Sequence, residues 1–126
     1  SSPLLPTDEP AADAAAPAAV DVAVRPFAFQ GACAAQARFG RALEDLGPQL
    51  AACYDLDPPR GGRLTYAVTA EGPQGRTVAR LEEATLLDSN LSDCLQRTFE
   101  RLPVVVGPDA TCTAQVRVVL RPKASP

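Results

Sequence analysis

Alternating apolar and polar positions indicate the strands of this chain. Apolar residues recur at every second position in residues 63–70 and again in residues 112–121. Such alternation is typical of an antiparallel sheet with one covered face. Residues 77–85 are predicted to return as the hairpin partner of the first run, and their imperfect alternation indicates a bulge. A shorter run, residues 20–24, predicts a weak strand that Pro26 confines to an edge or a strand end.

Two other stretches repeat apolar residues at helical spacing. Residues 33–54 place them at intervals of three and four, on one face of a helix that Pro48 kinks or restarts. Residues 91–102 repeat the pattern after Asp88, a good N-cap residue, and Pro103 ends it. The order strand, helix, hairpin, helix, strand predicts an α+β domain. In it, a small antiparallel sheet of three to four strands packs on two helices.

The predicted domain spans residues 20–122. Residues 1–19 are rich in Pro and Ala without apolar periodicity, which predicts an extended tail or linker, and residues 123–126 are expected to fray. The chain contains no Met, even at position 1, so we expect a processed or trimmed product. No apolar run reaches the roughly 18 residues that span a bilayer, so we expect no membrane span in this chain. A lipid anchor upstream is compatible with this expectation.

The charge and the residue types argue against several functions. The net charge is −3, whereas nucleic-acid binding calls for a clustered basic face. The absence of His removes the commonest general base and the commonest metal ligand. Glu82 and Glu83 are neighbours on a predicted strand, so their side chains are expected on opposite faces and cannot share a proton. We therefore predict a protein that is not an enzyme and that uses no metal and no cofactor.

The four cysteines predict an oxidising compartment. Cys33, Cys53, Cys94 and Cys112 contain no Cys-x-x-Cys pair, which is the pattern of a disulfide framework. Buried free thiols are an alternative, and so is a metal site that would need all four thiolates to converge. Export, with the signal already removed, explains both the cysteines and the missing Met.

One stretch of the chain resembles a known family. The C-terminal domain of the AgmX/PglI type, from predatory and gliding myxobacteria and their relatives, is similar to the TonB C-terminal domain, and the resemblance covers roughly residues 50–122. The residues that carry it are Cys53-Tyr54, Gly62 with the alternation to Ala70, Gly75-x-x-Val78, Leu87-Asp88 and Cys94-Leu95. Leu102-Pro103 stands where the family usually has Phe-Pro. The chain has no inner-membrane helix or long Pro-rich spacer, so the resemblance does not extend to TonB-like force transmission.

The resemblance implies a sheet packed against helices, a disulfide between Cys53 and Cys94, a periplasmic or outer-envelope location and a role in binding proteins. Cys33 and Cys112 are additional to the family pattern, and we infer that they pair with each other.

We therefore expect an exported, periplasmic or outer-membrane-associated module without catalytic activity. Its partners would be other envelope proteins, bound as an extended segment along an open sheet edge. The last strand, residues 111–121, is the predicted edge, unless residues 20–24 cover it. Its binding residues would be Thr113, Gln115, Arg117, Val119 and Arg121. The alternative is a structural or accessory subunit of a large outer-membrane or secreted assembly, held by an ordered segment 1–19.

Overall fold

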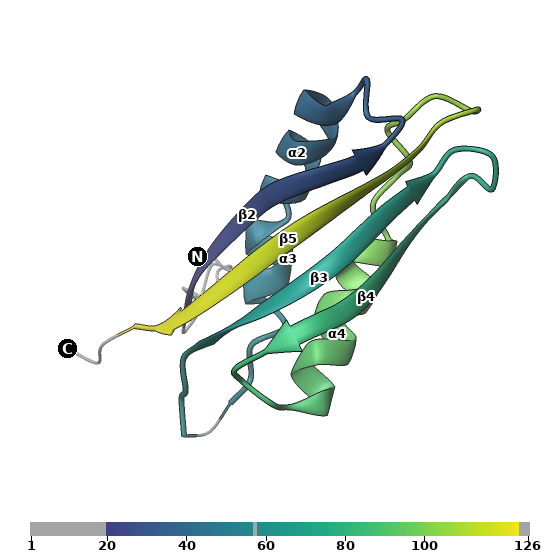
Figure 1. The fold of residues 1–126 in the computed structure, drawn as a ribbon. Coiled ribbons are helices and arrows are strands. Elements are labelled where there is room, and N and C mark those ends of the chain that lie inside the picture. The colour runs from purple at the N-terminus through teal and green to yellow at the C-terminus, as the bar shows by residue number, and fades with distance from the viewer. Residues whose placement is uncertain (1–19, 57, 124–126) are drawn as a thin grey trace, which may run out of the picture.

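The computed structural model describes residues 20–56 and 58–123. The predicted tail at residues 1–19 lies outside the described residues, as do Asp57 and residues 124–126. Within the described ranges a four-stranded antiparallel sheet packs against helices on one side, which confirms the expected α+β class (Figure 1). The elements in chain order are β2 (Val20–Gly31), α2 (Gln36–Glu44), α3 (Gly47–Ala51), β3 (Gly62–Glu71), β4 (Arg76–Ala84), α4 (Ser89–Glu100) and β5 (Thr111–Pro122).

The strand order is β2-β5-β3-β4, and every neighbouring pair is antiparallel. The hairpin between β3 and β4 turns at Gly75, whose φ of 64° favours glycine. Strand β2 continues past Pro26, further than the sequence predicts, and a register shift between Pro26 and Ala28 absorbs the extra residue, Phe27. Pro26 is tolerated because β2 is an outer strand, where a missing N–H need not break the sheet ladder.

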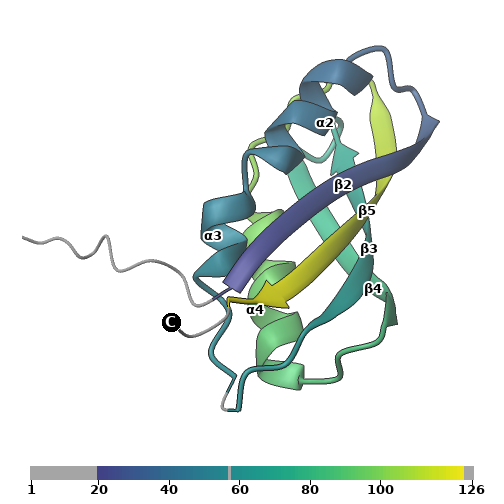
Figure 2. The ribbon, with the colours of Figure 1, turned by 90° about the vertical axis from the view of Figure 1, so that its left-hand side faces the viewer.

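The core lies between the sheet and the helices, as the side view shows (Figure 2). Strands β3 and β5 turn every second side chain toward this core, and the helices add Leu and Phe from their facing sides. Tyr66 and Phe99 are both fully buried, with ring centroids 5.2 Å apart, and they join β3 to α4. The other inward residues of β3 and β5 are Leu64, Val68, Ala70, Cys112, Ala114, Val116, Val118 and Leu120.

The helix boundaries follow from local signals. Pro48 lies in the first turn of α3, so it begins a new short helix after α2 ends. Asp88 caps α4, because its Oδ1 accepts a hydrogen bond of 2.9 Å from the Leu91 amide. Helix α4 ends at Glu100, shortly before Pro103.

Two disulfides hold the helical layer. Cys33–Cys112 joins the loop before α2 to β5, with Cα atoms 5.1 Å apart. Cys53–Cys94 joins the turn after α3 to α4, with Cα atoms 5.7 Å apart. These are the same pairs that the resemblance implied and that we inferred. The four sulfurs are bonded in these two pairs, so none of the four cysteines is a free thiol in this structure.

Candidate interaction surface

The strand predicted to be the open edge lies inside the sheet. Strand β5 pairs along its length with β2 on one side and β3 on the other. The prediction of a β5 edge is therefore wrong, because β2 is much longer than the weak strand expected at residues 20–24 and covers it. The five residues assigned to that edge project instead from the sheet face that the described helices leave uncovered, here called the bare face. They are Thr113, Gln115, Arg117, Val119 and Arg121.

The two outer strands are β2 and β4, and β4 is partly occupied. Glu100 of α4 accepts a hydrogen bond of 3.0 Å from the Ala79 amide through its side-chain Oε2. The Thr77 hydroxyl donates one of 2.8 Å to the Leu102 carbonyl. Helix α4 and the segment after it therefore cover the first half of this edge.

The outer side of β2 is open in the described structure. From Val20 to Phe29, its backbone makes no hydrogen bond to any residue of 20–56 or 58–123 other than its β5 partners. Figure 2 views the molecule from this side, and β2 lies in front with α2 and α3 beside it. An unpaired strand edge can accept an additional strand, although a proline and a bulge in mid-strand limit this. The free edge of β2 is therefore divided near Pro26.

A hollow of about 220 Å³ lies beside this edge, between β2 and α2. Phe29 and Pro26 contribute its strand side, while Gly40 and Arg41 belong to its helix side. A Cβ on Gly40 would approach the Phe29 ring to 3.4 Å, so the glycine keeps the strand and the helix close. A side chain from an added strand could enter this hollow.

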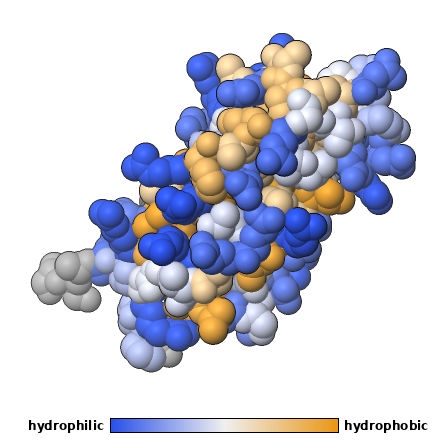
Figure 3. Space-filling view, viewed as in Figure 1, coloured by the Kyte–Doolittle hydropathy of each residue, from blue (hydrophilic) through white to orange (hydrophobic). Residues whose placement is uncertain are grey.

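Hydrophilic side chains cover much of the bare face, with apolar ones among them (Figure 3). The charged side chains are arranged differently at its two ends. At the β3–β4 hairpin, Arg76 Nε donates to Glu71 Oε1 at 2.7 Å, which raises the pKa of Arg76. Further along β4, Glu82 forms an ion pair with Arg80 at 3.2 Å and accepts from Gln115 at 2.9 Å. The charges of this region are therefore paired within the chain.

Glu82 and Glu83 do not point to opposite faces, so that expectation is wrong. A register shift opposite residues 65 and 66 of β3 leaves Glu82 as the extra residue of β4. Glu83 is the register partner of Thr65, on the bare face, and the hydrogen bond to Gln115 places the Glu82 carboxylate there too. Both side chains share one face because a bulge places two residues opposite one. Glu82 is held by Arg80 and Gln115 rather than by its neighbour.

The other end of the bare face holds a groove of about 540 Å³ lined by arginines. Arg25 of β2 lies directly opposite Arg117 of β5, and Arg63 of β3 lies opposite Val119. Arg121 lines the same groove. Arg117 also lies over the half-exposed ring of Phe27, with its Cζ 5.0 Å from the ring centroid. Arg117 and Arg121 are among the predicted binding residues, whereas Arg25 and Arg63 are not. No signal in the sequence predicts the cluster, because its members come from three strands that only the sheet brings together.

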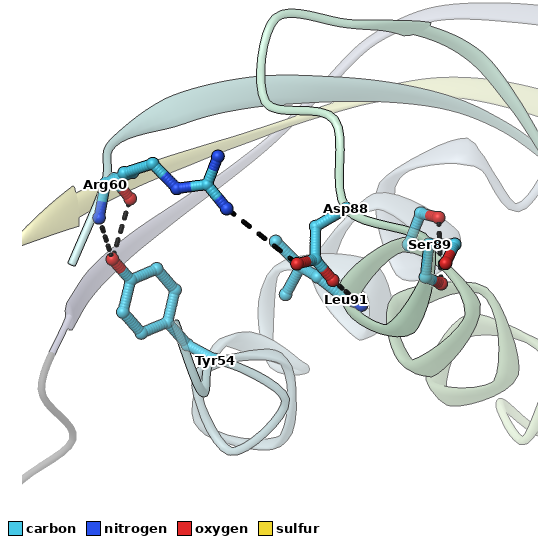
Figure 4. Close-up of polar contacts among 6 residues, drawn as sticks. Tyr54, Arg60, Asp88, Ser89 and Leu91 are labelled. Atoms are coloured by element: carbon cyan, nitrogen blue, oxygen red, sulfur yellow. Dashed lines mark hydrogen bonds and ion pairs between the residues drawn. The ribbon is translucent and has the colours of Figure 1, made fainter. Parts of the chain in front are cut away.

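The loop between α3 and β3 is fastened to the start of α4 (Figure 4). The Tyr54 hydroxyl donates to the Arg60 carbonyl and accepts from the Arg60 amide, both at 2.7 Å. The Arg60 guanidinium reaches Asp88 at 3.8 Å, while Asp88 caps α4 through the Leu91 amide. These contacts fix a loop and a helix start, and each group is satisfied by another group of the chain.

Tyr66 is the ionisable group most affected by the core. Its hydroxyl donates to the Ser92 carbonyl at 2.9 Å. Burial raises the pKa of Tyr66 well above its ordinary value, and the negative charge of Asp93 adds to the effect. This phenol is therefore neutral and structural at ordinary pH.

The fold and these surfaces define a disulfide-linked, two-layer α+β domain with an open outer strand and a charged bare face. Comparison with known protein families, with curated proteins and with solved structures finds no match to this chain. None of the helices in the described part of the chain is long and apolar enough to cross a membrane.

Proposed function

We propose that this protein is a non-catalytic interaction module of the cell envelope that binds an extended segment of a partner protein along β2. The open outer side of β2 from Val20 to Phe29 is the observation that carries this proposal. Strand addition to a free edge supplies affinity through backbone hydrogen bonds and specificity through alternate side chains. The hollow between β2 and α2 provides a place for such side chains.

The two disulfides and the family resemblance support an exported location. Disulfides persist in oxidising compartments such as the bacterial periplasm and are rare in the cytosol. The resemblance to the AgmX/PglI type and to the TonB C-terminal domain implies an envelope location and protein partners. The proposed partners are therefore other envelope proteins in the periplasm or at the outer membrane.

Peptide selection followed by NMR mapping tests the edge directly. Peptides selected from a random display library against the whole chain are titrated into labelled protein. We expect amide shifts and slower hydrogen exchange in β2 on its outer side, with β4 unchanged. Selected peptides that shift β4, or neither outer strand, would contradict the proposal.

Neighbouring proline variants provide a matched control. Successive amides of a strand point to opposite sides, and proline has no N–H. Of the variants Ala23→Pro and Val24→Pro, one therefore loses a hydrogen bond to β5, and the other loses an N–H that points away from the sheet. The variant that loses the outward donor should keep the fold and lose peptide binding. Unchanged binding in that folded variant would exclude strand addition at this half of β2.

The alternative is a structural or accessory subunit held in a large assembly by residues 1–19, which lie outside the described residues. Deletion of this segment separates the two proposals. Loss of assembly with peptide binding retained would favour the alternative, whereas loss of neither would favour the edge.

A further inference from the structure

We propose that the arginine groove on the bare face is a second binding site, which takes an acidic segment of a partner polypeptide. Four guanidinium groups, those of Arg25, Arg63, Arg117 and Arg121, line one groove that crosses β2, β5 and β3. This site is distinct from the outer side of β2, because these side chains project from the bare face. It does not depend on strand addition.

The positive charge of the groove is not neutralised inside the described structure. None of the four arginines forms an ion pair with a carboxylate in residues 20–56 or 58–123. The arginines at the other end of the same face, Arg76 and Arg80, each have a carboxylate partner. The groove therefore gathers four unpaired guanidinium groups in a chain whose net charge is −3.

Two carboxylates border the groove without cancelling its charge. Asp21 is the register partner of Arg121, and it forms a long ion pair of 3.8 Å with Lys123. Glu83 is separated from Arg117 by the Thr65 position of β3. Two negative charges at the border face four arginines and one lysine, so the region remains positive.

The fold itself does not require this arrangement. Arg25 and Arg117 are exposed and lie directly opposite each other across the β2–β5 pair. Like charges in directly opposite positions destabilise a sheet. An anionic ligand would convert this repulsion into charge-assisted hydrogen bonds, because guanidinium groups bind carboxylates in a bidentate manner.

The dimensions of the groove favour a polypeptide segment over a single anion or a membrane. Neighbouring strands lie about 4.8 Å apart and alternate residues about 6.8 Å apart along a strand, so the arginines form an array wider than one carboxylate. An extended peptide with acidic residues at alternate positions repeats its carboxylates at that same spacing of about 6.8 Å. The site is a hollow of about 540 Å³, which a chain segment can enter and a flat lipid surface cannot fill.

The test uses the whole chain and a fluorescently labelled peptide of alternating aspartate and serine. Anisotropy should show saturable binding that weakens as salt is raised. The variant R25Q/R63Q should weaken binding at least ten-fold, because the peptide loses charge-assisted hydrogen bonds to two of the four guanidinium groups. The variant R76Q/R80Q removes the same charge from the paired end of the same face, and its binding should be unchanged. Circular dichroism verifies that both variants are folded.

Three results would overturn the proposal. Equal weakening in both variants would mean that only the overall charge matters. Binding to phosphatidylglycerol vesicles with none to the peptide would assign the groove to a membrane. Segment 1–19 carries three acidic residues, Asp8, Glu9 and Asp13. Peptide binding that appears only in the variant D8N/E9Q/D13N would mean that this segment competes for the groove. Since none of these variants alters the outer side of β2, the result is independent of the strand-addition experiment.

Discussion

The two faces of the sheet show how one alternating pattern serves stability and recognition separately. On the covered face, inward residues of β3 and β5 such as Val68 and Val116 are fully buried against the helices. On the bare face, the residues between them are mostly polar, and they include exposed arginines such as Arg117 and Arg121. Burial of an aliphatic or aromatic side chain contributes about 1.5–3 kcal/mol, whereas exposed charge pairs contribute about 1 kcal/mol or less. The bare face can therefore vary with little effect on the fold.

The two ends of the bare face also differ from each other, in whether their charged side chains form ion pairs. Near the hairpin, Glu71 and Glu82 neutralise the neighbouring arginines. At the opposite end, Arg25 and Arg117 lie side by side without a carboxylate partner among the described residues. Paired charges are already satisfied, so only the unpaired end retains charge for another molecule.

The largest loss should follow removal of the disulfide that ends on the covered face of β5. Cys33 and Cys112 are 79 residues apart in sequence. In the loop-entropy description, a crosslink of this span contributes about 4.5 kcal/mol to the free energy of unfolding. Urea denaturation of C33A/C112A should show a loss of this order, and C53A/C94A, with a span of 41, a slightly smaller one. A loss below about 1 kcal/mol in one variant would show that the disulfide removed in it adds little to the stability.

The same substitution, Phe to Ala, can be made on each face of the sheet, and its cost in stability can be compared. Phe99 is fully buried between α4 and the sheet, while Phe27 is 49% exposed on the bare face. Phe99→Ala should cost about 3–5 kcal/mol because it leaves a cavity in the core. Phe27→Ala should cost far less, since about half of this side chain is already exposed to solvent. Similar losses in chemical denaturation would contradict the distinction between the faces.

The buried hydroxyl of Tyr66 makes the stability of the fold depend on pH. Tyr66→Phe removes the hydrogen bond to the Ser92 carbonyl and should cost about 1 kcal/mol at neutral pH. The pKa of Tyr66 is raised in the folded protein, so above about pH 10 the unfolded chain releases a proton that the folded one keeps. Stability should therefore fall as pH rises past that point. The fall should be smaller in Tyr66→Phe, and identical pH profiles would refute this cause.

The smallest expected effects are changes in stability that have opposite signs at the two ends of the bare face. Arg25→Gln relieves the repulsion with Arg117 and should stabilise the protein by a few tenths of a kcal/mol. Arg76→Gln removes the hydrogen bond to Glu71 and should lower the melting temperature slightly. Differential scanning calorimetry at low salt resolves the comparison. The same sign in both variants would show that the ends do not differ as described.

Local physics alone determined much of this protein from its sequence. The period of two in residues 63–70 and 112–121 identified β3 and β5, because side chains of a strand alternate between faces whatever its neighbours are. The spacing of apolar residues and the position of Pro48 identified the helices and the break between them. The N-cap at Asp88 and the irregularity of β4 were also local signals.

The tertiary structure alone determined the strand order and which side chains of distant segments lie side by side. It placed β2 outside β5, which removed the expected edge and gave Thr113, Gln115 and Val119 a different surface. It also gathered Arg25 and Arg117 from opposite ends of the described chain into one groove. Strand order and register depend on pairings between segments far apart in sequence, where the alternation of each strand fits several partners equally well. Only the packing of the whole sheet selects one of them.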